Sequence, residues 1–153
     1  MTSLTLVRRI AARPSIVFDA LTTAKGLAAW WGPDDLPVIK AEVDARVGGT
    51  FRVRFRTLDG QEHEARGDYL EVDRPRRLVM SWRYAFGGEP EEDGRTSRIE
   101  IELRALEGGT ELTFAHSDLR GAASRASHER GWTGSLAKLV RLFADARNPI
   151  DPP

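Results

Sequence analysis

The stretch that decides the fold is residues 97–116, SRIEIELRALEGGTELTFAH, in which apolar residues occupy every second position on both sides of a glycine pair. Such an alternation is typical of a β-strand with one buried face. The glycine pair at positions 108 and 109 is typical of a hairpin turn. The stretch therefore predicts an antiparallel hairpin whose second strand carries His116 on the same face as Leu112 and Phe114.

Five further segments carry strand signals, at residues 4–10, 37–43, 51–56, 62–72 and 77–84. The segment 51–56, FRVRFR, alternates most clearly, whereas the segment 62–72 is interrupted by Gly67. A glycine inside a strand pattern indicates a bulge that shifts the register. Together with the hairpin, these segments predict about seven strands in all.

Helical signals occur in two places. Pro14 fits the first turn of a short helix that ends near Leu21, and Thr23 is suited to cap a second helix that ends at Gly32 and Pro33. A long helix is expected from about Ser124 to Ala146. Its apolar residues recur at spacings of three and four and form one stripe: His128, Trp132, Leu136, Leu139, Val140 and Phe143.

A strand, two short helices, a run of strands and one long helix make an α+β order. A curved antiparallel sheet wrapped around the C-terminal helix satisfies that order. Since one helix cannot fill the concave face of seven strands everywhere, we expect a cavity between the helix and the sheet.

Composition bounds the classes of function. The chain has 153 residues, which fits one domain, expected at residues 1–147, followed by a frayed Pro-rich tail at 148–153. The 23 basic and 23 acidic side chains cancel, so no net field favours nucleic acid or an anionic membrane. Cysteine is absent, and with it disulfides and thiolate metal sites. No apolar run is long enough to span a membrane, so we expect a cytoplasmic protein.

Aromatic side chains with inward parity are the first candidates to line the cavity. Trp30 and Trp31 are consecutive, so on a helix they point about 100° apart; we expect one to pack in the core and the other to line the mouth. Each of these side chains alone also fits an ordinary core position. The full set of expected ligand-binding residues is Trp31, Phe55, Met80, Trp82, Tyr84, His116, His128, Trp132 and Leu136.

The histidines leave two interpretations open. His116 and His128 could converge where the long helix meets the sheet and act as a general acid–base pair, or they could be satisfied by hydrogen bonds within the core. A metal site with Glu129, Asp118 or His63 would need a fixed set of ligands, and the sequence lacks His-x-x-x-His spacing. We therefore expect neither a metal nor a cofactor.

Two glycines interrupt the predicted long helix, at positions 131 and 134. Each costs about 1 kcal/mol relative to alanine in a helix interior. Close packing of the helix on its surroundings is one explanation, and room for a ligand against the helix backbone is the other.

The order and spacing of several motifs resemble the SRPBCC superfamily of START-like and Bet v 1-like proteins. These motifs are Val17-Phe18-x-Ala20-Leu21, Trp30-Trp31-x-Pro33, Gly48-Gly49-x-Phe51 and Pro75-x-Arg77-Leu78-Val79-x-Ser81-Trp82. The later pattern is similar to the subfamily named after the activator of Hsp90 ATPase homologue 1: Leu112-Thr113-Phe114-x-His116 followed by His128-Glu129-x-Gly131-Trp132-x-x-x-Leu136. The resemblance covers about residues 4–143 and implies the helix-grip fold with a hydrophobic cavity.

Three functions are compatible with this resemblance, since a fold does not fix a function. The first is binding of a small hydrophobic or aromatic molecule in the cavity, with no catalytic residue. The second is a cyclase, hydrolase or isomerase that uses His116 or His128 as general acid or base. The third is an Hsp90-activator-like interaction module, although the sequence shows no counterpart of the additional N-terminal domain of the eukaryotic activators. We expect a monomer or a weak homodimer.

Overall fold

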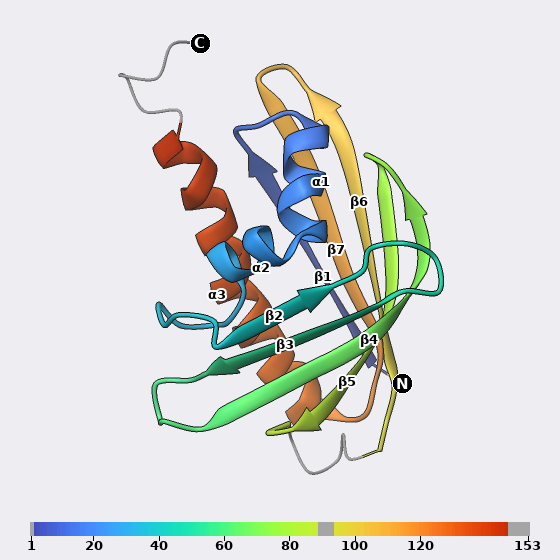
Figure 1. Cartoon of the computed structure of the whole chain (residues 1–153), viewed down its shortest axis with the longest axis vertical. Coiled ribbons are helices and arrows are strands. Elements are labelled where there is room, and N and C mark those ends of the chain that lie inside the picture. Colours follow the sequence, from blue (N-terminus) through green and yellow to red (C-terminus); the bar gives the residue numbers. More distant parts are fainter. Residues whose placement is uncertain (1, 89–93, 147–153) are drawn as a thin grey trace.

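The fold is a curved antiparallel sheet wrapped around helices (Figure 1). The computed structural model describes residues 2–88 and 94–146, and within them lie seven strands and three helices. The strands are β1 (Thr2–Ile10), β2 (Lys40–Val43), β3 (Thr50–Arg56), β4 (Glu62–Asp73), β5 (Arg77–Phe86), β6 (Ser97–Leu106) and β7 (Gly109–Leu119). The helices are α1 (Pro14–Thr22), α2 (Ala24–Trp30) and α3 (Ala122–Ala146).

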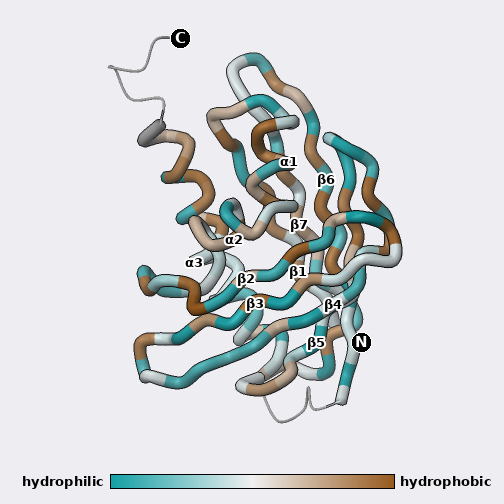
Figure 2. Tube along the Cα trace, viewed as in Figure 1, coloured by the Kyte–Doolittle hydropathy of each residue, from teal (hydrophilic) through white to brown (hydrophobic). Residues whose placement is uncertain are grey.

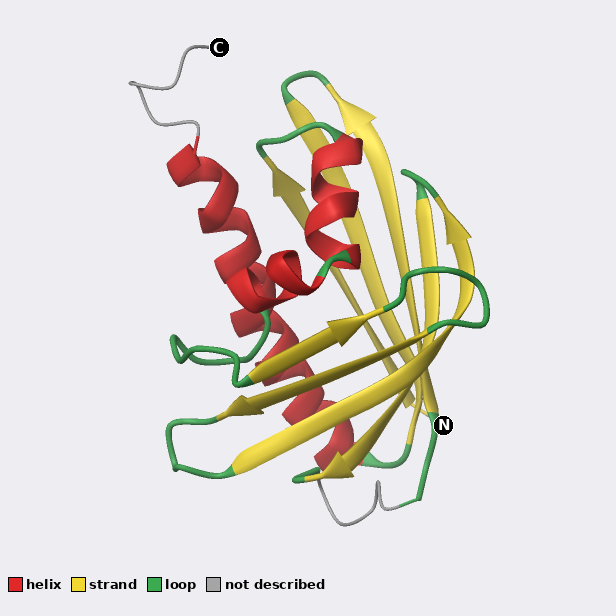
Figure 3. Ribbon diagram, in the orientation of Figure 1, coloured by secondary structure: helices red, strands yellow, loops and turns green. Residues whose placement is uncertain are grey.

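All neighbouring strands pair antiparallel, in the order β1-β7-β6-β5-β4-β3-β2. The three helices lie on the same, concave face of the sheet, and α3 runs across it (Figure 3). The predicted α+β helix-grip architecture is confirmed, with its seven strands, long C-terminal helix and two short helices after the first strand. The tail expected at residues 148–153 lies outside the described residues.

The predicted hairpin has the expected register. Arg98 pairs with Ser117 and Leu106 with Gly109, so that the apolar positions of β6 and β7 face the helices. The alternation is visible as changing colour along these strands in Figure 2. It fills the concave face with apolar side chains, which supply most of the stability of such a domain.

No helix in the described part of the chain is long and apolar enough to cross a membrane.

The start of α2 is fixed as the sequence predicts, by the side chain of Thr23. Its hydroxyl accepts a hydrogen bond from the Gly26 amide at 3.0 Å, which satisfies one of the free donors at the helix N-terminus. The helix ends at Trp30, two residues before the expected end at Gly32 and Pro33. Trp31 is extended, with φ −67° and ψ 148°.

Gly67 has a different role from the expected bulge. The register shifts between β4 and β5 lie on either side of it, between Glu64 and Ala65 and between Tyr69 and Glu71. A Cβ atom at position 67 would lie 1.9 Å from the carbonyl oxygen of Ser81 and 2.5 Å from the ring of Phe51. The glycine therefore permits a close approach of the neighbouring strand and of an aromatic ring, and the register shifts have other origins.

Candidate functional site

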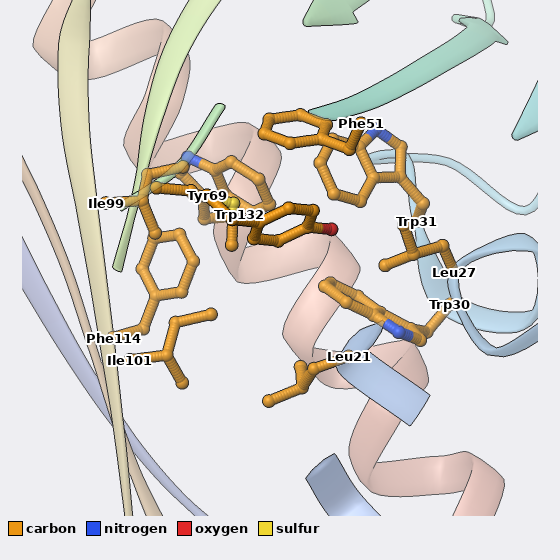
Figure 4. A pocket seen from close by; sticks show the side chains of 11 residues that line it. Leu21, Leu27, Trp30, Trp31, Phe51, Tyr69, Ile99, Ile101, Phe114 and Trp132 are labelled. Carbon is orange, nitrogen blue, oxygen red and sulfur yellow. The ribbon is translucent and has the colours of Figure 1, made fainter. Parts of the chain in front are cut away.

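The centre of the interface between sheet and helices is filled by the protein's own side chains. What remains there is a void of about 10 Å³, which we call the inner void (Figure 4). Its lining is entirely apolar or aromatic: Leu21, Leu27, Trp30, Trp31, Phe51, Tyr69, Met80, Ile99, Ile101, Phe114 and Trp132. A space of this size holds at most a water-sized sphere, so the middle of the grip offers no room for a ligand.

Trp30 and Trp31 both line the inner void, although they were expected not to enter one space. Of the two, only Trp31 also lines the open space beside it, so one indole packs in the core and the other reaches the mouth. Their ring centroids lie 5.6 Å apart, and both side chains are buried. In Figure 4 the two indoles approach from α2 while Ile99, Ile101 and Phe114 approach from the sheet.

A second, open space of about 80 Å³ lies beside the inner void, and we call it the pocket. It lies between the N-terminal half of α3, strands β3 to β5 and the segment after α2. Its lining residues are Trp31, Gly32, Pro33, Phe55, Thr57, His63, Trp82, Tyr84, Ser127, His128, Gly131, Trp132 and Ser135. None of these side chains is a carboxylate, an ammonium or a guanidinium.

The pocket continues outward into a larger groove of about 680 Å³. Pocket and groove share the lining residues Pro33, Thr57, His63, Tyr84, Ser127 and Gly131. The groove adds the charged side chains of Asp34, Asp59 and Arg130. An apolar inner part with a polar mouth is the usual arrangement of a small-molecule site.

Six of the nine expected ligand-binding residues line the pocket: Trp31, Phe55, Trp82, Tyr84, His128 and Trp132. Met80 lines the inner void instead, and His116 and Leu136 are buried residues that line neither space. The residues that sequence reasoning missed are Gly32, Pro33, Thr57, Ser127 and Ser135. A usable signal existed on the helix, where Ser127, Gly131 and Ser135 recur at intervals of four and so share one face.

The aromatic wall of the pocket is held rigid by ring contacts around Trp82. Trp31 stacks on it, with a centroid distance of 5.5 Å and an interplanar angle of 21°. Trp132 and Tyr84 meet it edge to face, at 5.1 Å and 5.6 Å. Offset-stacked and edge-to-face pairs are the favoured arrangements of aromatic rings, so this wall is formed before any ligand arrives.

His116 is a neutral core histidine with both ring nitrogens occupied. The indole Nε1–H of Trp132 donates to its Nδ1 at 3.0 Å, and its Nε2 lies 2.7 Å from the Ser97 hydroxyl. Because an indole nitrogen can only donate, Nδ1 is unprotonated and Nε2 carries the proton. Burial, together with the neighbouring His128, holds the pKa of His116 well below its ordinary value.

His128 converges on His116, as the sequence suggested, and it is the one of the two that faces the pocket. The ring centroids of the two histidines lie 4.4 Å apart. The imidazole of His128 stacks on Tyr84, with a centroid distance of 5.7 Å and an angle of 24°. Core hydrogen bonding therefore explains His116, whereas His128 lines the pocket.

The mouth is held by polar contacts between the segment after α2 and its neighbours. The Asp34 carboxylate accepts a hydrogen bond from the Leu58 amide at 2.9 Å, which joins this segment to the turn between β3 and β4. Lys138 of α3 donates to the carbonyl oxygens of Trp31 and Asp34, at 3.0 Å and 2.7 Å. Burial lowers the pKa of Lys138, while the carboxylates of Asp35 and Asp34 oppose that shift.

The two glycines of α3 have opposite surroundings. A Cβ atom at Gly131 would meet nothing within 4 Å outside its own helix, and Gly131 lines the pocket. A Cβ atom at Gly134 would lie 2.3 Å from the carbonyl oxygen of Pro33. Close packing therefore explains Gly134, and open space towards the pocket surrounds Gly131.

This difference predicts stability changes of opposite sign. We expect Gly131→Ala to raise the free energy of unfolding by about 1 kcal/mol, because alanine favours the helix and meets open space. Gly134→Ala should lower it by about 1 to 3 kcal/mol, because the helix must move away from Pro33. Urea unfolding of both variants measures the two changes. A loss of stability in Gly131→Ala would show that the space beside residue 131 is not free.

A metal site finds no support in the geometry. Among residues 2–88 and 94–146, no three side chains of His, Cys, Asp or Glu gather closely enough to hold a metal ion. Glu129, one of the candidate metal ligands, forms an ion pair with Arg125 at 3.2 Å in the first turns of α3.

Comparison with known proteins places the chain in a family. The family model for "Activator of Hsp90 ATPase homolog 1-like protein" matches residues 11–144. Protein CV1439 from Chromobacterium violaceum is 28% identical, with full coverage of both chains and a TM-score of 0.80. The AHSA1 protein from Silicibacter pomeroyi is 26% identical over 94% of this chain and 98% of its own, with a TM-score of 0.78.

A third solved structure, protein NE0264 from Nitrosomonas europaea, is 25% identical over 95% of this chain and 96% of its own, with a TM-score of 0.76. No curated protein matches the chain significantly. The family model, the solved structures and the helix-grip topology agree. The chain therefore belongs to the Activator of Hsp90 ATPase homolog 1-like family, which has the Bet v 1-like fold.

Proposed function

We propose that the protein binds a small apolar or aromatic molecule, with a ring of the ligand inserted in the pocket and its remainder in the groove. The observation that carries the proposal is the pocket itself, an uncharged space walled by aromatic rings that opens to solvent through a polar groove. Transfer of apolar ligand surface from water to this wall would supply the affinity.

The volumes limit the ligand. The pocket, at about 80 Å³, is smaller than the roughly 150 Å³ of an apolar cavity that binds benzene, and the inner void adds only about 10 Å³. A single ring would therefore fill the pocket and extend into the groove, and a steroid or a long acyl chain would not fit. A larger molecule would have to leave most of its surface in the groove, near the charged groups of Asp34, Asp59 and Arg130.

The two other functions have less support. An acid–base enzyme would rest on His128 rather than on the expected pair, since both nitrogens of His116 are occupied. The family name refers to activation of the Hsp90 ATPase. A partner protein of that kind requires a docking surface, and a small pocket is not evidence for one.

The test is a binding titration with toluene, followed by the protein's own fluorescence. Three of the four tryptophans line the pocket, namely Trp31, Trp82 and Trp132. We expect a saturable change in their emission. Gly131→Leu should weaken toluene binding by at least about tenfold, since the new side chain occupies the pocket; tenfold corresponds to about 1.4 kcal/mol.

The matched control is Thr133→Leu, which places the same side chain on the exposed surface of α3. This variant should bind toluene like the wild type. A folded Gly131→Leu variant with unchanged affinity for toluene would show that the pocket is not the binding site.

A further inference from the structure

A chain of hydrogen bonds connects the surface to the pocket through Asp59, Thr57 and His63. The Thr57 hydroxyl donates to the Asp59 carboxylate, and the same oxygen lies 3.2 Å from Nε2 of His63. A carboxylate only accepts, so the single hydroxyl proton of Thr57 points to Asp59. Thr57 must then accept from His63, which places the imidazole proton on Nε2.

The carboxylate end of this chain is well defined. The Asp59 side chain also accepts from the Gln61 amide at 3.0 Å. The hydrogen bonds from Thr57 and Gln61 lower the pKa of Asp59, so the group that accepts from Thr57 is ionised at neutral pH. The ionised carboxylate can only accept, so Thr57 donates to Asp59 and His63 donates to Thr57.

The other nitrogen of His63 is left as a bare acceptor. Nδ1 is buried and has no hydrogen-bond partner among the described residues. The ring is oriented by stacking on Phe55, with a centroid distance of 5.1 Å and an angle of 13°. His63 lines both the pocket and the groove, so this acceptor belongs to a side chain at their junction.

Gly87, which also lines the groove, covers this nitrogen. A Cβ atom at position 87 would lie 2.7 Å from Nδ1 and equally close to the carbonyl oxygen of Glu62, so the backbone of Gly87 packs directly on the acceptor. A buried acceptor without a donor is costly and uncommon in native proteins. A ligand donor that moves Gly87 aside would satisfy it.

We propose that His63 is the polar anchor of the site, and that its Nδ1 accepts a hydrogen bond from the hydroxyl group of a bound phenol. Thr57 and Asp59 are positioning residues, which hold the imidazole in the tautomer that accepts at Nδ1. The inference rests on the proposed function and narrows the ligand from small aromatic molecules to those that carry a hydroxyl donor on the ring.

The test compares phenol with toluene, which has nearly the same shape and lacks the donor. We expect the ratio of phenol to toluene affinity to fall about tenfold in His63→Phe, which corresponds to the loss of one hydrogen bond to a buried acceptor. Because phenylalanine keeps a ring in contact with Phe55, and because the comparison is a ratio, any change in packing that affects both compounds alike cancels. An equal ratio in the two proteins would overturn the assignment of His63.

The positioning role has a spectroscopic readout that simple packing would not affect. Nitrogen-15 NMR of the imidazole should show the Nε2-protonated tautomer of His63 in the wild type, and phenol should shift the Nδ1 resonance whereas toluene should not. Thr57→Val should redistribute the tautomers and lower the ratio of phenol to toluene affinity. A predominantly Nδ1-protonated ring in the wild type would contradict the proposal.

The two proposals fail in different ways. If phenol and toluene bind the wild type with equal affinity and Gly131→Leu binds neither, the pocket is the binding site and His63 is not its anchor. Absence of binding by either compound removes both proposals.

Discussion

Trp132→Phe is expected to lower the free energy of unfolding by on the order of 3 kcal/mol. The change removes part of a buried side chain and also the Nε1–H that donates to His116 at 3.0 Å. His116 is 0% exposed, so its abandoned Nδ1 cannot find water as a replacement donor. A buried acceptor without a donor retains the full cost of its desolvation.

Trp82→Phe is the matched control. Trp82 is also buried, at 3% exposure, but its Nε1 has no hydrogen-bond partner among the described residues. The same substitution there removes ring volume without breaking a hydrogen bond, and we expect a loss of about 1 kcal/mol. Thermal unfolding compares the two variants, with a shift of about 2–4 °C for each kcal/mol in a protein of this size. Equal losses would contradict the pairing of Trp132 with His116.

Acidification from pH 7 to pH 5 is expected to destabilise the protein through His116. The pKa of this imidazole in the folded state lies well below the ordinary value of 6.5 because of its burial and its neighbour His128. In this pH range the unfolded chain therefore takes up a proton at His116 that the folded chain does not. Stability is lost as the pH falls through the ordinary value, with a slope that approaches about 1.4 kcal/mol per pH unit.

His116→Gln isolates this contribution, because glutamine does not titrate. Urea unfolding at both pH values should show a smaller stability difference in the variant than in the wild type. Proton NMR of the wild type provides a second measurement, in which His116 should titrate well below the ordinary pKa of histidine. A normal titration of His116 would show that burial and the neighbouring His128 do not lower its pKa.

The fold could be predicted because each element carries its own local signal. The period-two alternation around the glycine pair at 108 and 109 fixes both the strands and the face that they bury. The side chain of Thr23 fixes the start of α2 through a hydrogen bond from the amide of Gly26, which is only three residues further along the chain. Such signals do not depend on distant parts of the chain, so a single sequence displays them.

The position of the free space could not be predicted in the same way. It depends on long-range contacts that fill the centre, such as the stacking of Trp31 on Trp82 of β5. It also depends on which glycine of α3 faces a neighbour, and the contact of Gly134 with Pro33 joins residues far apart in the sequence. The sequence therefore predicts that a cavity exists, and tertiary packing decides at which end it lies.

The side chain of His63 lies on the inner face of β4, which the bulge expected at Gly67 left undecided. The register shift between Glu64 and Ala65 adds a residue to β5 and not to β4. On the other side His63 pairs with Phe55, whose inward face the sequence predicts correctly. Along β4 itself, His63 shares the parity of the buried residues Ala65 and Tyr69, so an alternation continued through Gly67 places it inward.

Crystallography with bromobenzene tests the binding pocket most directly, because the anomalous signal of bromine locates a small ring without assumptions about its polar groups. The expected result is one bromine site in the space bounded by Trp82, His128 and Gly131. The rings of Trp31, Trp82, Tyr84 and Trp132 should keep their positions. A pocket that stays empty at saturating bromobenzene, with the halogen bound elsewhere or nowhere, would contradict a small-molecule site at this end of the grip.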